Sequence, residues 1–400
     1  YERCQSQVDA SKEEISQMSD IVTEAIESGA LGFSTSRTIL HRDVHGVYVP
    51  GTEASSEEMK SLAFAIDKAG EGTLEIVSDW LDKEIEMSWM REYVEKSDCG
   101  LTVLQTSGDA VKTILFCEEQ FLKGKNVRPQ FPGRNVGMMF GLESSLHPFI
   151  GHPSYREIAD LPLSERVKIM KDPAFKEKLL NEKPNFASEI EKSMNEQGNT
   201  KSQEEIKEAA NLGLKLISNY DTQFILGDPP NYEPGKEDSI AALAKSKGIA
   251  ELEVIYDEFL KNEGTNLVYA CFTPYDNHKL DFVERAYSLK SSVAGGSDGG
   301  AHCGLICDAS MPTTNLSHWA RDREAGKKIP IELIVRKQTK DTAETYGLFD
   351  RGEIKTGMLA DLNIIDFEKL NVTHPKMVYD LPLGGRRLIQ TSSGYLATVK

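Results

Sequence analysis

Short runs of apolar residues alternate with longer amphipathic segments over the first third of the chain. Four runs have the length and composition of strands, and the segments between them carry apolar residues at the 3,4-spacing typical of helices. The predicted strands cover 30–36, 73–77, 101–104 and 126–131, and the predicted helices cover 55–69, 81–96 and 109–121. A further helix precedes the first strand and should end at Gly29. Because helices between strands form crossover connections, this pattern favours a parallel α/β sheet.

The pattern changes after about residue 147. The segment 147–215 is charged, helical and interrupted by prolines, so we interpret it as an insertion. Strands are predicted again at 222–226, 267–271 and 292–295, with helices over 239–261 and 331–346. Short strands and turns follow from residue 352. We therefore expect a barrel-type domain over 1–350, with the insertion at about 147–215, and an all-β part over 351–400.

The composition excludes several classes of protein. The chain has 400 residues, with 46 Lys and Arg against 63 Asp and Glu, which gives a net charge of −17. This excess argues against nucleic-acid binding, since phosphate contacts need a basic surface. No apolar run reaches the roughly 18 residues of a membrane-spanning helix, and no signal peptide is visible at the start. We therefore expect a cytoplasmic protein with neither nucleic acid nor membrane as a partner.

The segment Gly295–His302 is the most informative candidate for chemistry. It places the carboxylate of Asp298 and the imidazole of His302 directly after a predicted strand, among glycines that let the backbone turn sharply. In an α/β barrel this position lies on the face where catalytic residues emerge from the strands. An alternative is that Asp298 caps the next helix. Spacing alone leaves both interpretations open.

Five segments together resemble the N-acyl-D-amino-acid deacylase (D-aminoacylase) family of the amidohydrolase superfamily. The last segment has the pattern G-x-I-x-x-G-x-x-A-D-L of the superfamily, and the glycine-rich segment with the first one narrows the resemblance to the deacylases. The segments are Gly29–Arg37, Val49–Thr52, Ser297–His302, Thr339–Leu348 and Arg351–Leu362.

The resemblance implies a (β/α)₈ TIM-type barrel with a helical insertion and a small β-sandwich. It also implies a site with Zn²⁺, in which Asp298 is a metal ligand. The family's His-x-His pair occurs nowhere among the eight histidines. We therefore expect a C-terminal fragment, with further ligands upstream of Tyr1 and a barrel left open between strands 30–36 and 292–295. Ser78 and Gln105 stand where the family carries metal-binding histidines, which makes a single metal the expectation.

The implied reaction is hydrolysis of a non-peptide C–N amide bond in a small N-acyl amino acid, with preference for the D-enantiomer. Asp298 would accept a proton from water and deliver it to the leaving amine. His302 would orient Asp298 or contact the tetrahedral intermediate, unless it is only a buried histidine. Two alternatives stay open: a hydantoinase-like or deaminase-like amidohydrolase, and a catalytically inactive barrel used for binding.

Two arginines are candidates for the substrate carboxylate, because a guanidinium group binds carboxylates in bidentate fashion. Arg37 lies at the end of the first predicted strand, and Arg134 follows the fourth. A surface ion pair is the alternative for both. His41 and His45 have the spacing of metal ligands on one helical turn, but the sequence after them is typical of a loop or strand.

Overall fold

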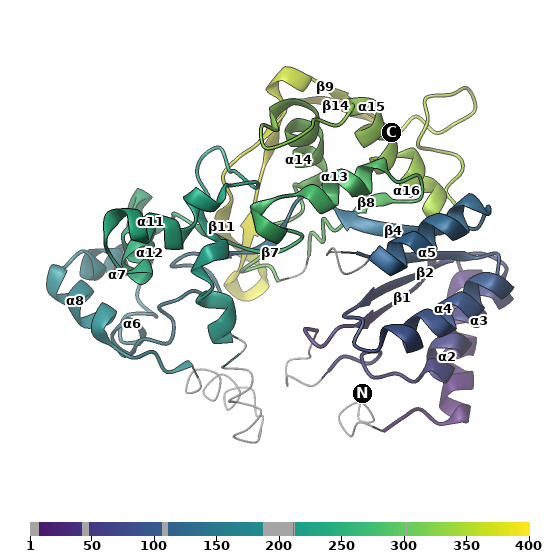
Figure 1. Cartoon of the computed structure of the whole chain (residues 1–400), viewed down its shortest axis with the longest axis horizontal. Helices are drawn as coiled ribbons and strands as arrows, with labels where there is room; N and C mark the ends of the chain where they lie inside the picture. The colour runs from purple at the N-terminus through teal and green to yellow at the C-terminus, as the bar shows by residue number, and fades with distance from the viewer. Residues whose placement is uncertain (1–7, 42–47, 106–110, 187–210, 212, 301) are drawn as a thin grey trace.

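A five-stranded parallel sheet organises the structure, a computed structural model that describes residues 8–41, 48–105, 111–186, 211, 213–300 and 302–400 (Figure 1). The strand order is β1-β2-β3-β4-β8, and every neighbouring pair is parallel. The strands are β1 (Gly32–Arg37), β2 (Thr73–Ser78), β3 (Gly100–Leu104), β4 (Val127–Pro132) and β8 (Val293–Gly295). The predicted parallel α/β sheet is confirmed. Within the described residues, β1 and β8 lie at the two edges of this sheet.

Amphipathic helices connect these strands and cover one face of the sheet. Leu74 and Ile76 of β2, with Leu101 and Val103 of β3, pack into a core with the apolar faces of the helices. Gly29 ends the first helix with φ +105°, as predicted. The helices along the sheet are α2 (Lys12–Glu27), α3 (Ser56–Ala69), α4 (Lys83–Lys96), α5 (Val111–Leu122), α13 (Asp281–Ser288), α15 (Ile331–Gln338) and α16 (Lys340–Thr345).

A second sheet is antiparallel and lies beside a lobe of helices, at the left of Figure 1. Its strand order is β5-β7-β6. The strands are β5 (Val136–Phe140), β6 (Gln223–Ile225) and β7 (Val268–Thr273), and the helices of the lobe are α6 (Pro153–Arg156), α7 (Leu163–Met170), α8 (Pro173–Asn181), α11 (Ile240–Lys247) and α12 (Glu251–Phe259). The predicted strands 222–226 and 267–271 therefore exist but do not join the parallel sheet.

The C-terminal residues form three two-stranded antiparallel ladders. Leu370, Val372 and Leu388 from this part pack into the same core as Trp319. The ladders pair β9 (Leu362–Ile365) with β14 (Tyr395–Val399), β10 (Asn371–Val372) with β13 (Ser392–Ser393), and β11 (Lys376–Leu381) with β12 (Gly385–Ile389). In the part of the chain that the structure describes, no helix is long and apolar enough to cross a bilayer.

His147 in the helical lobe should make the protein sensitive to acid. Its ring is buried against Phe149, Tyr155 and Phe259, and burial, reinforced by the nearby Arg166, lowers its pKa to about 3. The unfolded chain, with an ordinary pKa near 6.5, binds more protons between pH 3 and 6.5. Stability should therefore fall by up to about 1.4 kcal/mol per pH unit as the pH drops below about 6.5.

Urea unfolding between pH 4.5 and 7.5 measures this slope. A His147→Asn variant tests its origin, because the amide oxygen can accept the hydrogen bond that Phe149 N donates to Nδ1, 3.2 Å away. This variant should lose most of the slope below pH 6.5. An unchanged slope would assign the acid sensitivity to other groups.

Candidate functional site

The carboxyl ends of the parallel strands carry the candidate residues, and the turn after β8 presents two of them. Asp298 and His302 are exposed and have positive φ values, +26° and +48°. The carbonyl of His302 accepts hydrogen bonds from the backbone N–H groups of Leu305 and Ile306. The next helix, α14 (Met311–Thr314), has Ser310 at its N-cap. The capping alternative for Asp298 is therefore wrong, and its carboxylate faces solvent.

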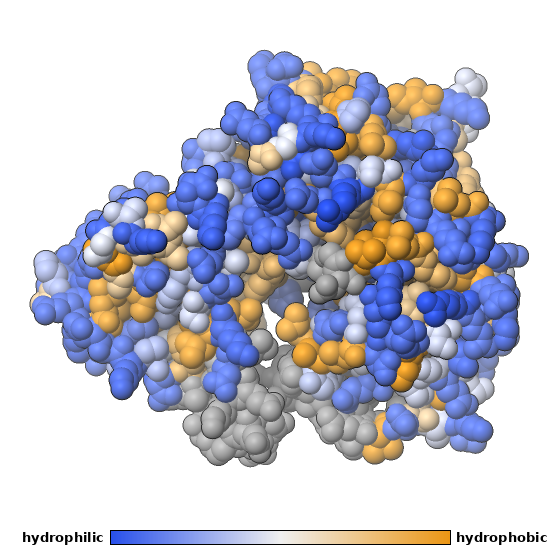
Figure 2. Space-filling model, in the orientation of Figure 1, coloured by the Kyte–Doolittle hydropathy of each residue, from blue (hydrophilic) through white to orange (hydrophobic). Residues whose placement is uncertain are grey.

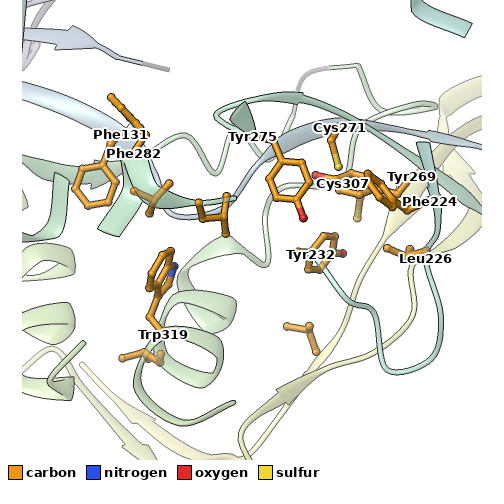
Figure 3. Packing of buried hydrophobic residues seen from close by; sticks show 14 of the residues in the cluster. Phe131, Phe224, Leu226, Tyr232, Tyr269, Cys271, Tyr275, Phe282, Cys307 and Trp319 are labelled. Carbon is orange, nitrogen blue, oxygen red and sulfur yellow. The ribbon is translucent and has the colours of Figure 1, made fainter. Parts of the chain in front are cut away.

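Arg134, in the loop after β4, is fully buried. One of its Nη atoms lies 3.0 Å from Oδ1 of Asp308, and the same nitrogen donates to the carbonyl of Cys307 at 2.9 Å. The guanidinium group stacks 3.7 Å from the ring centroid of Tyr232 and contacts the hydroxyl of Tyr269. Figure 3 shows Tyr232, Tyr269 and Cys307 grouped in this part of the core. Arg134 therefore has structural partners on several sides.

Asp308 is a charged residue of the site that the sequence did not indicate. Its side chain is 2% exposed, and burial raises its pKa to about 6; Arg134 opposes the rise and the negative charge of Asp298 adds to it. The two turns are close, because a Cβ added to Gly299 would lie 3.3 Å from the Cβ of Ala309. In the sequence, the one feature that could have pointed to Asp308 is its position ten residues after Asp298.

Arg37 occupies the end of β1, as predicted, and forms an ion pair across the loops. Its Nε lies 2.6 Å from Oε1 of Glu86 on α4, and both side chains are largely buried. One Nη donates to the carbonyls of Gly51 and Ala54 at 2.8 and 3.0 Å. These bonds fix the loop after β1. Substrate binding by Arg37 or Arg134 stays a prediction, since both have other partners here.

The ends of β2 and β3 carry no histidine. Ser78 is the last residue of β2, and Gln105 follows β3 with its side chain buried. His41 lies near this edge, where its Nδ1 is 2.7 Å from the hydroxyl of Ser36. His45 lies outside the described residues.

The described residues alone do not fit a metal site. Among them, no group of three or more His, Cys, Asp or Glu side chains is arranged to hold a metal ion. Asp298 would contribute a single oxygen donor, and the neighbouring Asp308 is already paired with Arg134. Protein sites for Zn²⁺ use three or four protein ligands. A complete donor set would need side chains from outside the described part.

Comparison with known proteins gives one family and a small set of structures. The sequence profile of the Amidohydrolase family matches residues 5–400. No curated protein matches the chain. The similar solved structures include a D-aminoacylase studied for the functional role of its binuclear metal centre and a D-aminoacylase mutant in complex with CuCl₂, both at 17% identity and a TM-score of 0.48. A third, a D-aminoacylase described as defining a novel subset of amidohydrolases, has a TM-score of 0.46 at the same identity. Each alignment covers 91% of this chain and 58% of the other, so the chain spans little more than half of those proteins.

Proposed function

The chain belongs to the Amidohydrolase family of hydrolytic enzymes, and from this premise we propose that the protein hydrolyses non-peptide C–N amide bonds in N-acyl-D-amino acids. The observation that carries the proposal is the position of Asp298. Its exposed carboxylate follows β8 on a glycine-rich turn, at the carboxyl edge of a parallel sheet. Ligands of α/β enzymes bind at this edge.

In the proposed reaction, water attacks the carbonyl carbon of the amide while a carboxylate oxygen of Asp298 accepts the water proton. The same proton passes to the amine nitrogen as the C–N bond breaks, which yields a free amino acid and a carboxylic acid that then loses its proton to solvent. His302 is four residues away on the same turn, and we assign it to orienting Asp298 or contacting the tetrahedral intermediate. Arg37 or Arg134 would bind the substrate carboxylate by exchanging one of its present partners.

For the metal we propose Zn²⁺, with Asp298 as one ligand. The remaining ligands would come from outside the described residues, because those residues supply too few donors. Zinc, manganese and iron content of the purified full-length protein tests this part of the proposal. About one bound zinc per chain is the expected result.

A catalytically inactive barrel that binds small molecules is the second candidate function. Ser78 and Gln105 at the ends of β2 and β3 favour it, since neither side chain is a usual zinc ligand. Full-length protein that binds no metal and hydrolyses no amide would support this candidate.

A substrate panel tests the proposed reaction. Full-length protein is incubated with N-acyl-D-amino acids, their L-enantiomers and hydantoins, and release of free amine or ring-opened product is measured. We expect the D-series to be preferred. Equal rates with both enantiomers would reject the stereochemical assignment, and faster ring opening would favour a hydantoinase-like enzyme.

A further inference from the structure

Exposed apolar side chains gather where the first three parallel strands of the sheet end. Leu40 follows β1, Leu81 and Ile85 follow β2, and Val111 and Leu115 lie in the first turns of α5 after β3. Each of these five side chains is more than half exposed, and Leu81 is 75% exposed. We call these five residues the apolar rim. Leaving so much apolar surface in water is costly, and such patches mark binding sites.

Two contacts place the segments that carry the apolar rim next to one another. The backbone N–H of Ile39 donates to Oδ2 of Asp79 at 2.8 Å, which places the loop after β1 beside the loop after β2. Nζ of Lys112 lies 3.8 Å from Oε1 of Glu84, which joins the start of α5 to the start of α4. Figure 2 shows hydrophobic surface over the starts of these two helices. The segments that carry the rim are therefore neighbours at this edge of the sheet.

The apolar rim lies on the same edge of the sheet as Asp298. The strand order places β3 and β4 between β2 and β8, so the ends of β2 and β8 are three strand spacings, or roughly 14 Å, apart. The intervening strands end near Gln105 and Pro132, which carry no charge. The apolar rim and Asp298 therefore lie along one edge of the parallel sheet.

We propose that the apolar rim binds the acyl chain of the substrate, and that the substrate class is therefore N-acyl-D-amino acids with a long unbranched acyl chain. This inference rests on the proposed function. A hydrocarbon chain is the occupant that the structure favours, because the rim continues the edge that carries Asp298. The net charge of −17 opposes the approach of a second copy or of an anionic membrane.

Binding of two ligands to the full-length protein tests the proposal without depending on turnover. N-dodecanoyl-D-alanine and N-acetyl-D-alanine are titrated by calorimetry and by tryptophan fluorescence. Trp80 precedes Leu81 and is partly exposed, whereas Trp89 and Trp319 are buried and should not respond. The dodecanoyl compound has about ten more carbon atoms, and we expect it to bind at least about 30-fold more tightly.

Paired substitutions locate the binding surface. Leu81→Ser with Leu115→Ser should weaken binding of the dodecanoyl compound by at least about tenfold and leave the acetyl compound within about twofold. Leu122→Ser is the matched control, because Leu122 is 63% exposed at the opposite end of α5. It should change neither affinity by more than about twofold.

Three results would overturn the proposal. The first is equal affinity of the wild-type protein for the two compounds. The second is a dimer that the double variant converts to a monomer in sedimentation experiments, which would make the rim an interface between copies. The third is binding of the wild-type protein and of the Leu122→Ser control to phosphatidylcholine vesicles, with loss of this binding in the double variant. Turnover measured on the same samples judges the proposed function separately, since tight chain-dependent binding without hydrolysis would keep this inference and reject the reaction.

Discussion

Replacing Asp298 with Asn in the full-length protein should lower kcat by about 10²–10⁴-fold while the fold stays intact. Asparagine keeps the size of the side chain and one acceptor oxygen, but it cannot take a proton from water. The backbone at Asp298 has φ +26°, a region that Asn adopts readily, and the side chain is exposed. Little stability should therefore be lost.

Turnover, melting temperature and metal content measured on one Asp298→Asn sample distinguish chemistry from structure. Asp79→Asn is the control, because Asp79 lies at the same edge of the sheet and its amide oxygen can still accept the bond from Ile39. It should keep kcat within a few-fold. His302→Asn should cost less than Asp298→Asn, since His302 is not expected to carry the proton. Normal turnover in the Asp298 variant would reject the catalytic assignment.

The parallel sheet was predictable because its local signals agree. β2 and β3 are short, largely apolar segments, and the helices α3, α4 and α5 separate the strands from β1 to β4. Ser55 and Asp82 accept hydrogen bonds from the first turns of α3 and α4, and Gly70 ends α3 with φ +84°. These signals lie within a few residues of the boundaries that they set, so the sequence contains them.

The antiparallel sheet was not predictable in the same way. Strands 222–226 and 267–271 were identified, but their partner β5 was missed and their pairing depends on contacts between distant residues. Gly137 on β5 illustrates this: a Cβ at that position would lie 2.4 Å from the carbonyl oxygen of Ala270. A short apolar run does not encode which strand lies beside it.

One part of the candidate site was predictable from the sequence and another part was not. The glycine-rich turn with Asp298 and His302 was found because glycines after a strand are a local pattern. The burial of Arg134 and its pairing with Asp308 were not found, because a charged residue gives the same signal in a sequence whether it is buried or exposed. Charged side chains are mostly exposed, so the sequence favoured a surface position or a substrate contact for Arg134.

Replacing Arg134 with Met should lower the free energy of unfolding by about 3–5 kcal/mol, because the variant leaves the carboxyl group of Asp308 buried without its partner. The loss should depend on pH. The pKa of Asp308 is already raised to about 6, and removal of the guanidinium group should raise it further. A carboxyl group with a raised pKa in the folded state binds more protons there than in the unfolded chain. Stability of the variant should therefore fall as the pH rises from 5 to 7.5.

The double variant Arg134→Met with Asp308→Leu separates the ion pair from the packing of its members. It removes both charges, so urea unfolding should show it to be more stable than Arg134→Met alone at pH 7.5, with little dependence on pH. Equal stability of the single and double variants would mean that the two groups are not coupled. A substrate-binding role for Arg134 has a different consequence. In that case both variants would lose the charge-assisted contact and raise KM for the N-acyl-D-amino acid, even where the double variant is as stable as the wild type.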